Sequence, residues 1–372
     1  MTLFLYRVLD SMERYRPTLV SLAMAADDPL SVRLLAPSSW RTGVQERSGI
    51  WRGIPVVYVG ACLTEFEFQR FRSRGVLTKL LSSFDLIQVI SGTPAMALTA
   101  AKLHKPSCLF VATTVKGERP SVLADTKWPR RVWLRLMTAI NSRSEARALQ
   151  IVDHVFALSE YTRSRLSTMV PEAMLSLGVP GIDTDLFHPQ EPPSCDGYVL
   201  SVGRFSDPRK NVGMLLDAYR RLVENLPHAP RLMLVGEHLR PQDWVSAQRW
   251  GIADRIDVRL NATPEELAPL YRQASLFALS SNEEGLGIVI LEAMASGLPV
   301  VSTRCGGPET CIVEGETGYL TPVGDSAALA RRMQMLLEDA VLRQRLGKAG
   351  REIAETRFSI QAAGEPFLEV YD

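Results

Sequence analysis

The chain has 372 residues, of which 46% are hydrophobic and 22% are charged, and its formal net charge is +1. This composition is typical of a globular protein with two domains, and it excludes disordered chains and strongly basic proteins that bind nucleic acid. No apolar run reaches the roughly 18 residues of a membrane-spanning helix. The five cysteines form no CxxC or Cys/His zinc pattern, which predicts reduced thiols in a cytoplasmic protein without a metal site.

The two halves of the chain differ in charge. Residues 1–190 carry 23 basic and 16 acidic side chains, whereas residues 191–372 carry 19 and 25. The Pro-rich polar stretch at residues 188–194 lies where the sign changes. Because such stretches are typical of linkers, we predict a first domain over residues 1–190 and a second that begins at residue 195.

Short β-rich runs alternate with helical patterns along the whole chain, which is typical of βαβ units and parallel sheets. The predicted strands of the first half are residues 3–6, 32–36, 55–59, 86–90, 108–112, 154–158 and 174–177. Those of the second half are residues 198–202, 232–235, 256–260, 276–279 and 300–303. Between them, residues 212–223 have the period of a helix, and Thr263 begins a capping box with Glu266. The fold class is therefore α/β, with two Rossmann-like domains and a ligand cleft between the carboxyl ends of two sheets.

A glycine-containing segment follows the predicted strand at residues 276–279. Glu284 comes just before two glycines, Gly285 and Gly287, and Glu292 lies eight residues further along the helix that they open. Glycines allow a ligand to approach backbone amides, and a helix N-terminus attracts anions. Eight helical residues span roughly 12 Å, which is the reach needed to hold both ends of a nucleotide sugar. The alternative is a glycine turn followed by a buried helix with one exposed carboxylate.

A basic loop follows the first strand of the second half. Arg204 and Lys210 lie between Gly203 and the next helix, so they are predicted at the carboxyl edge of a sheet. A planar guanidinium and a compact ammonium suit a diphosphate. The alternative is a solvated basic loop.

Together these two segments resemble the retaining glycosyltransferases of family 4 (glycosyl transferases group 1), which have the GT-B fold. The resemblance continues through residues 297–301, 306–309 and 314–320, and through residues 181–189 further back. It is dense over about residues 145–372. It implies an N-terminal domain at residues 1–190 on the acceptor side, a donor domain at residues 195–355, and a C-terminal helix at residues 356–372 that returns to the first domain.

The resemblance implies an enzyme that moves a sugar from a nucleoside-diphosphate sugar to a hydroxyl of a glycan, glycolipid or small-molecule acceptor, with retention and without metal or cofactor. Arg204 and Lys210 would neutralise the diphosphate, Glu284 would hold hydroxyls of the donor sugar, and Glu292 would bind the ribose. The remaining donor-binding residues implied are Gly203, Gly285, Leu286, Gly287 and Ile288.

The first half departs from the family pattern. The family's first loop has paired glycines, but residues 10–14 contain none, and no histidine falls within residues 110–118, where the family places one beside the donor sugar. Thr114 or Lys116 would replace that histidine on the acceptor side. Two other classes therefore stay open: a nucleotide-sugar isomerase on the same fold, and a non-catalytic partner subunit of a glycosyltransferase.

Two further segments have patterns that indicate binding. Asp183 and Asp185 form a D-x-D pattern of the kind that binds a metal in another glycosyltransferase fold, but here it falls where the family has an unrelated turn. Residues 127–137 mix cations with tryptophan and aliphatic side chains, which suits contact with an anionic membrane and predicts a peripheral position at the inner face of the cell membrane. The alternative is a solvated helix whose tryptophans pack inward.

Overall fold

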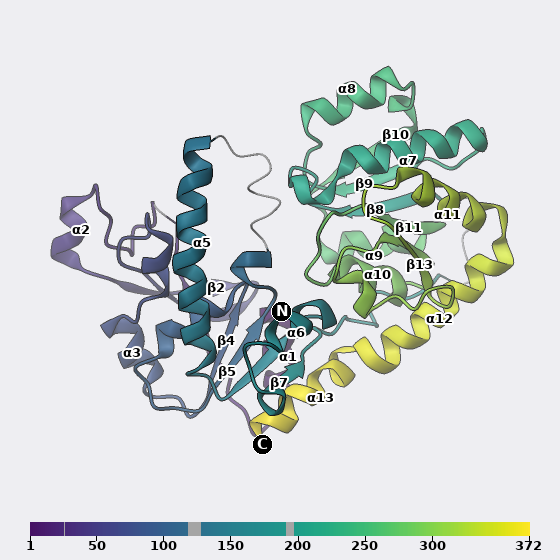
Figure 1. Cartoon of the computed structure of the whole chain (residues 1–372). Coiled ribbons are helices and arrows are strands. Elements are labelled where there is room, and N and C mark those ends of the chain that lie inside the picture. Colours follow the sequence, from purple (N-terminus) through teal and green to yellow (C-terminus); the bar gives the residue numbers. More distant parts are fainter. Residues whose placement is uncertain (26, 118–127, 191–196) are drawn as a thin grey trace. The chain divides into compact units, whose positions relative to one another are not determined.

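The computed structural model describes residues 1–25, 27–117, 128–190 and 197–372 (Figure 1). It divides into two compact units. The first comprises Met1–Leu158, Thr162–Gly178 and Pro366–Asp372, and the second comprises Ser159–Tyr161 and Val179–Glu365. The division falls earlier than the predicted boundary at residues 190–195, part of which lies outside the described residues. The predicted C-terminal segment, residues 356–372, is shared between the two units.

Residues just after the division are bonded into the second unit. The guanidinium of Arg351 donates to the backbone carbonyls of Thr184 and Phe187, at 3.0 and 2.7 Å. The ring of Phe187 also packs edge-on against Tyr271, with 5.7 Å between centroids. These contacts explain why Thr184 and Phe187 are grouped with the second unit.

The first unit contains two sheets. A three-stranded sheet has the order β1-β3-β2, with β1 parallel and β2 antiparallel to β3, and a four-stranded parallel sheet has the order β4-β5-β6-β7. The strands are β1 (Leu19–Leu22), β2 (Glu46–Trp51), β3 (Ile54–Val59), β4 (Ile87–Ser91), β5 (Ser107–Val111), β6 (His154–Ala157) and β7 (Leu175–Leu177).

Two of the strands predicted in this unit are wrong. Residues 3–6 belong to the helix α1 (Thr2–Asp10), which buries Phe4, Leu5 and Val8 at helical spacing. A short apolar run fits either element, and here the buried positions recur every three to four residues. Residues 32–36 contribute only an isolated bridge between Val32 and Cys62. Strands β1 and β2 were not predicted.

The helices of the first unit cover its sheets. They are α1, α2 (Pro37–Thr42), η1 (Glu67–Phe71), α3 (Gly75–Leu81), η2 (Pro94–Ala100), α5 (Trp128–Leu149), α6 (Glu160–Leu166), whose first two residues are grouped with the second unit, and η3 (Glu172–Met174). The end of α13 (Ile360–Tyr371) completes the core, because Phe367 packs against the rings of Phe4, Phe110 and Phe156 at 6.0, 5.0 and 4.2 Å.

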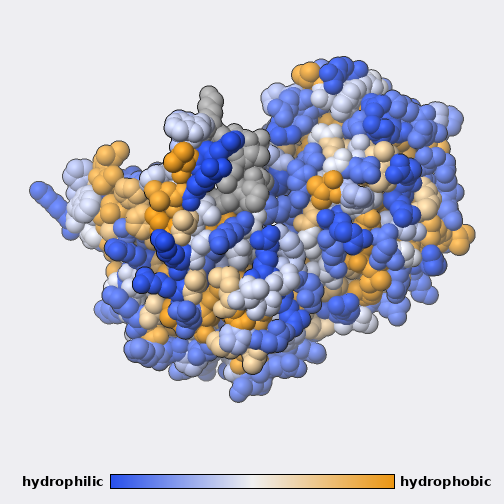
Figure 2. Space-filling view, viewed as in Figure 1, coloured by the Kyte–Doolittle hydropathy of each residue, from blue (hydrophilic) through white to orange (hydrophobic). Residues whose placement is uncertain are grey.

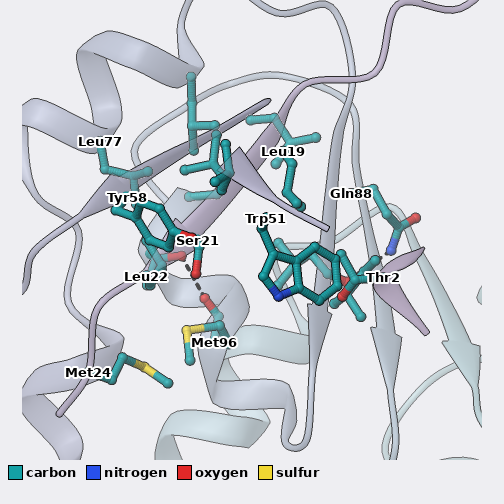
Figure 3. Close-up of a pocket in the computed structure, with 18 residues that line it drawn as sticks. Thr2, Leu19, Ser21, Leu22, Met24, Trp51, Tyr58, Leu77, Gln88 and Met96 are labelled. Atoms are coloured by element: carbon teal, nitrogen blue, oxygen red, sulfur yellow. Dashed lines mark hydrogen bonds between the residues drawn. The ribbon is translucent and has the colours of Figure 1, made fainter. Parts of the chain in front are cut away.

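A cavity of about 440 Å³ lies in the first unit (Figure 3). Residues of both β1 and β4, the edge strands of the two sheets, line it. Leu19, Trp51, Leu77 and Met96 are among the side chains around it, and none of the described residues in its lining is charged. A cavity without a cation is unsuited to a diphosphate, so this cavity is not a candidate for the donor site.

The second unit is built on one six-stranded parallel sheet with the order β10-β9-β8-β11-β12-β13. Its strands are β8 (Val199–Gly203), β9 (Leu232–Gly236), β10 (Ile256–Leu260), β11 (Leu276–Leu279), β12 (Val300–Thr303) and β13 (Gly318–Thr321). Successive strands lie on one side of β8 and then, from β11, on the other. This is the order of doubly wound Rossmann sheets, so the second unit is Rossmann-like, as predicted.

Helices surround this sheet and bury its apolar strands. They are η4 (Pro208–Lys210), α7 (Val212–Asn225), α8 (Pro241–Arg249), η5 (Ala253–Arg255), α9 (Pro264–Arg272), α10 (Ile288–Ala295), η6 (Pro308–Thr310), α11 (Ser326–Glu338) and α12 (Ala340–Phe358). The helix predicted at residues 212–223 is confirmed by α7, and the capping box between Thr263 and Glu266 is confirmed at the start of α9. Within the described part of the chain, no helix has the length and apolar content to cross a lipid bilayer.

Candidate functional site

The two segments singled out in the sequence leave the sheet of the second unit at neighbouring points. Gly203 ends β8 and Leu279 ends β11, and these two strands are adjacent and parallel. The chain turns to opposite sides after them. In open α/β sheets ligands bind outside the carboxyl ends of strands at this kind of switch point, where the two loops diverge. The order of the strands therefore places both loops at the edge where a ligand is expected.

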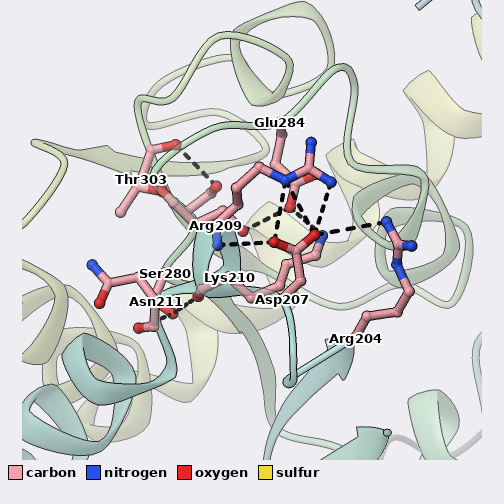
Figure 4. A network of polar contacts seen from close by, with 10 residues as sticks. Arg204, Asp207, Arg209, Lys210, Asn211, Ser280, Glu284 and Thr303 are labelled. Atoms are coloured by element: carbon pink, nitrogen blue, oxygen red, sulfur yellow. Dashed lines mark hydrogen bonds and ion pairs between the residues drawn. The ribbon is translucent and has the colours of Figure 1, made fainter. Parts of the chain in front are cut away.

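The loop after β8 is organised by Asp207 (Figure 4). Its carboxylate caps η4 by accepting the backbone N–H of Arg209 at 3.0 Å, and it holds the Arg209 guanidinium at 2.8 to 3.2 Å. Burial raises the pKa of Asp207, but the hydrogen bonds and charge of Arg209 outweigh it and leave that pKa below its usual value. Arg204 lies 3.7 Å from the same carboxylate and its side chain is 66% exposed. The contacts of Asp207 thus hold the backbone of the loop in place, while the Arg204 side chain is exposed to solvent.

Lys210 and Glu284 meet across the two loops (Figure 4). The Lys210 ammonium lies 2.5 Å from Oε1 of Glu284, and the hydroxyl of Ser281 donates to the same oxygen at 2.6 Å. The two side chains are only 17% and 11% exposed. Both residues were predicted to bind the donor, and the structure brings them together although they are 74 positions apart in sequence. An ammonium has three donors, so Lys210 can hold Glu284 and still bind an anion.

Backbone contacts fix the two loops against each other. The hydroxyl of Ser280 donates to the carbonyl of Lys210 at 2.9 Å, and the N–H of Asn282 donates to the carbonyl of Arg209 at 2.7 Å. The hydroxyl of Thr303, at the end of β12, donates to the carbonyl of Ser281 at 2.5 Å. Sequence reasoning did not identify these polar residues, although the Ser-Ser-Asn run directly after an apolar strand was a signal for loop contacts.

Two glycines, one at the end of the second loop and one in the loop after β12, have distinct roles. Gly287 caps α10 with a φ of +83°, a conformation that favours glycine. A helix leaves its first amides without intrahelical acceptors, and these are the amides predicted to face sugar and phosphate. Gly307 is required by a close approach instead, because a Cβ there would lie 2.4 Å from the Cα of Leu286. Its N–H donates to the carbonyl of Glu284 at 3.0 Å.

Glu292 lies in the second turn of α10 and is not an exposed carboxylate. It is partly buried, and its Oε2 accepts a hydrogen bond from the hydroxyl of Tyr271, in α9, at 2.7 Å. Burial raises the pKa of Glu292, and the hydrogen bond from Tyr271 acts in the opposite direction. The pKa of Tyr271 is raised well above its usual range by its burial and by the neighbouring carboxylate. Tyr271 was not predicted from the sequence.

The residues predicted on the acceptor side, Thr114 and Lys116, belong to the first unit. Thr114 is buried, and its hydroxyl accepts the N–H of Gly117 at 3.3 Å, whereas Lys116 is exposed. Residue 118, which closes that predicted stretch, lies outside the described residues. In the D-x-D pattern, the carboxylate of Asp183 accepts the N–H of Leu186 at 3.0 Å, which is a local turn contact.

The chain is similar to known proteins in sequence and in fold. Residues 196–339 match the family of glycosyl transferases group 1. The phosphatidyl-myo-inositol mannosyltransferase of Mycobacterium leprae is 34% identical over 175 residues, which are 47% of this chain and 46% of that protein. The chain spans about half the length of the curated relatives it matches.

Two solved structures share the fold over most of the chain. The sucrose-phosphate synthase of Thermosynechococcus elongatus aligns with a TM-score of 0.74 at 20% identity, covering 99% of this chain and 90% of that one. The Anabaena protein HepE in complex with UDP-glucose aligns with a TM-score of 0.68 at 20% identity, covering 86% of each chain. The protein is thus similar to glycosyl transferases group 1 in the sequence of its second unit, and its fold is the GT-B fold of glycosyltransferases.

Proposed function

We propose that this protein transfers a sugar from a nucleoside-diphosphate sugar to a hydroxyl of a glycan, lipid-linked or small-molecule acceptor, with retention at the anomeric carbon and without a metal ion or other cofactor. The observation that carries the proposal is the 2.5 Å contact between Lys210 and Glu284 at the switch point of the second sheet. The match to glycosyl transferases group 1 over residues 196–339 supports the reaction class. The complex of HepE with UDP-glucose supports a nucleotide-sugar donor.

The cations and amides at the switch point would bind the donor diphosphate. Lys210 has donors left after its contact with Glu284, and the exposed Arg204 guanidinium is held only at 3.7 Å from Asp207, so it can turn toward a ligand. The backbone amides at the start of α10, around Gly287 and Ile288, add the partial positive charge of a helix N-terminus. Gly203, which ends β8, leaves room for the phosphates beside the Lys210 side chain.

Glu284 would hold the donor sugar. Within the described part of the chain, its bonds from Lys210 and Ser281 both end on Oε1. Its Oε2 is then the oxygen that accepts sugar hydroxyls, while the bonded oxygen keeps the carboxylate oriented. The neighbouring backbone of Gly285 and Leu286 would complete the sugar contacts.

Glu292 would bind the nucleotide ribose in the same way. Tyr271 donates to its Oε2, which leaves Oε1 to accept ribose hydroxyls. Because the tyrosine fixes the rotamer of Glu292, the ribose meets an oriented acceptor.

The transfer breaks the bond between the anomeric carbon and a diphosphate oxygen and forms one from the acceptor oxygen to that carbon. Negative charge develops on the leaving diphosphate, and oriented cations and amides stabilise it; losing one such donor commonly lowers the rate by about 10²–10³. The acceptor proton passes to the departing phosphate, so no separate general base is required. Thr114 and Lys116 are proposed on the acceptor side.

Thermal unfolding with a panel of nucleotides and nucleotide sugars tests donor binding without an acceptor. A ligand at about 100 times its Kd adds roughly 2.7 kcal/mol of stability. The unfolding temperature should rise with nucleotides of one base, and Arg204→Ala should abolish this rise. The control Arg259→Ala, which removes an exposed arginine elsewhere in the same unit, should retain it. No shift with any nucleotide would favour a non-catalytic partner subunit.

A second variant tests the chemistry. Glu284→Gln keeps the shape of the side chain and removes its charge, and transfer should fall at least about 100-fold while circular dichroism stays that of the parent protein. Sugar product formed without any acceptor would favour the isomerase instead.

We also place the protein in the cytoplasm, peripheral at the inner face of the cell membrane. The scattered cysteines support a reducing compartment, and the four in the described residues carry free thiols. The basic, tryptophan-containing segment at residues 127–137 supports a membrane contact; residue 127 lies outside the described residues.

A further inference from the structure

The tryptophans of the two units are placed differently. Trp244 and Trp250 pack against the core of the second unit. The other four belong to the first unit, and all are exposed: Trp40 by 53%, Trp51 by 36%, Trp128 by 76% and Trp133 by 47%. Large aromatic side chains are normally buried at least in part, and a contiguous cluster of exposed apolar side chains marks an interaction site.

Two of these tryptophans lie on the outer end of α5. Trp128, Val132 and Leu136 are spaced four residues apart and therefore form one line along the helix, and Trp133 lies beside it. Their exposed fractions are 76%, 52%, 53% and 47%. The predicted alternative, in which the tryptophans pack inward, is wrong. Figure 2 shows apolar and hydrophilic surface next to each other over this end of α5.

The opposite face and the far end of α5 fix the helix in the first unit. Leu134 and Met137 are buried beneath the exposed line, and Asn141, Glu145 and Leu149 are buried along the second half. The first turns project beyond the sheets of this unit (Figure 1). The exposed line is thus presented by a helix that is anchored in the core rather than by a loose segment.

The charged side chains on the first turns of α5 all have one sign. Arg130, Arg131 and Arg135 lie in the first turns of α5, Arg130 and Arg135 are exposed, and no acidic residue occurs between Trp128 and Ser144. The helix N-terminus contributes further partial positive charge. An apolar line bordered by arginines of the same helix is complementary to a lipid bilayer surface, in which anionic headgroups lie above an apolar layer.

We infer that the exposed face of α5, formed by Trp128, Val132, Trp133 and Leu136 with Arg130 and Arg135, docks on an anionic lipid bilayer. The indole rings enter the interfacial layer, where an amphipathic ring finds both apolar and polar surroundings, and the guanidinium groups contact lipid phosphates. This inference deepens the proposed membrane location, and it does not depend on the donor site of the second unit.

Flotation of the purified full chain with lipid vesicles tests the inference. The probes are vesicles of phosphatidylcholine alone and of phosphatidylcholine with 30 mol% phosphatidylglycerol. The protein should float with the anionic vesicles and not with the neutral ones, and binding should decrease from 0.1 to 0.5 M salt because the charges are exposed. Equal flotation with both vesicles, or flotation with neither, would overturn the inference.

Matched variants locate the surface. Each cation near an anionic surface contributes about 1 kcal/mol, so Arg130→Glu/Arg135→Glu should weaken the partition coefficient at least about 30-fold. Arg345→Glu/Lys348→Glu changes the net charge equally on exposed residues of α12 and should leave binding unchanged. If both pairs weaken binding to the same extent, net charge and not this face is responsible, and the inference fails.

The apolar contribution and the competing occupant are tested separately. Trp128→Ala/Trp133→Ala should weaken binding at least about tenfold, since apolar area would no longer enter the interface. The competing occupant is a second copy of this chain, which light scattering after size exclusion detects. If the protein is a dimer, if these substitutions convert it to a monomer and if it does not bind vesicles, the lipid assignment is overturned. The nucleotide-induced thermal shift should be the same in every α5 variant, which separates failure here from failure of the proposed transfer reaction.

Discussion

The ion pair between Lys210 and Glu284 joins the two loops of the candidate site, and its removal should be costly to the second unit. The two side chains are 17% and 11% exposed and their charged atoms lie 2.5 Å apart. Lys210→Met keeps the aliphatic stem and removes the ammonium. Glu284 then retains the hydroxyl of Ser281 at 2.6 Å as its hydrogen-bond donor, and a largely buried carboxylate is left without a counter-charge.

The expected magnitude follows from the burial of the pair. A hydrogen bond to a charged group contributes about 1.5–3 kcal/mol, and removing one partner of a fully buried pair costs about 3–5 kcal/mol. Because both groups keep some contact with water, we expect Lys210→Met to lower the free energy of unfolding by about 2–3 kcal/mol. Glu284→Gln in the same chain removes the uncompensated charge, so the double variant should recover about 1–2 kcal/mol of that loss.

Urea unfolding at pH 7 measures these differences. Trp244 and Trp250 report on the second unit once the four exposed tryptophans of the first unit are replaced by phenylalanine. The control is Arg231→Met, which breaks an ion pair with Asp257 at 2.6 Å whose side chains are 52% and 41% exposed. Exposed pairs contribute about 0–1 kcal/mol, so this control should change stability little.

The reasoning is refuted if Lys210→Met costs no more than Arg231→Met, or if the single and double variants show no coupling. The loops would then be held together by their backbone contacts, in which Ser280 and Asn282 donate to the carbonyls of Lys210 and Arg209.

Two further changes test local features of the second unit. Burial raises the pKa of Asp217, but hydrogen bonds from Ser326 and two arginines lower it to about 2. The carboxylate therefore stabilises the fold above pH 4, and this contribution is lost as the pH falls toward 2; Asp217→Asn should cost about 2 kcal/mol at pH 7 and progressively less below pH 4 in thermal unfolding. Gly307→Ala places a Cβ 2.4 Å from the backbone of Leu286 and should cost more than about 2 kcal/mol in urea unfolding, whereas Gly75→Ala meets no atom within 4 Å and should be neutral or stabilising.

The sequence predicted the second unit well because its signals are local. Several of its strands, such as β9 and β11, are continuous apolar runs, as expected for strands buried on both faces, and five of the six strands were placed. The capping box of α9 is formed entirely by Thr263 and Glu266, three residues apart. A contact that depends on neighbouring residues alone can be predicted without the tertiary structure.

The first unit was harder because its signals conflict. Residues 3–6 are as apolar as a strand, and only the buried positions Phe4, Leu5 and Val8 show that the element is a helix. Strand β2 is exposed at nearly every position, so it has no alternation of apolar and polar residues to detect. What forms it is the two-residue turn at Arg52 and Gly53, both with positive φ, which returns the chain onto β3.

At the candidate site, the sequence indicated which residues meet but not what holds them. Lys210 and Glu284 follow strands that topology makes adjacent, so their proximity could be predicted from the edge of the sheet. Asp207 could have been found as a cap, since it directly precedes the proline that begins η4. Tyr271 gave no such signal, because its contact with Glu292 depends on how two helices pack.

The pairing of Glu292 and Tyr271 could not be predicted from helical spacing alone. Both alternatives drawn from the sequence left Glu292 open to solvent or ligand, but the hydroxyl of Tyr271 is carried by a fully buried residue and needs an acceptor. A buried hydroxyl without an acceptor and a partly buried carboxylate without a donor would each destabilise the folded state. The 2.7 Å hydrogen bond satisfies both groups. The same bond restricts Glu292 to one orientation, so a residue that contributes to the packing of α9 on α10 also offers its second oxygen in a fixed direction. Structural and ligand-binding roles therefore do not exclude each other at this position.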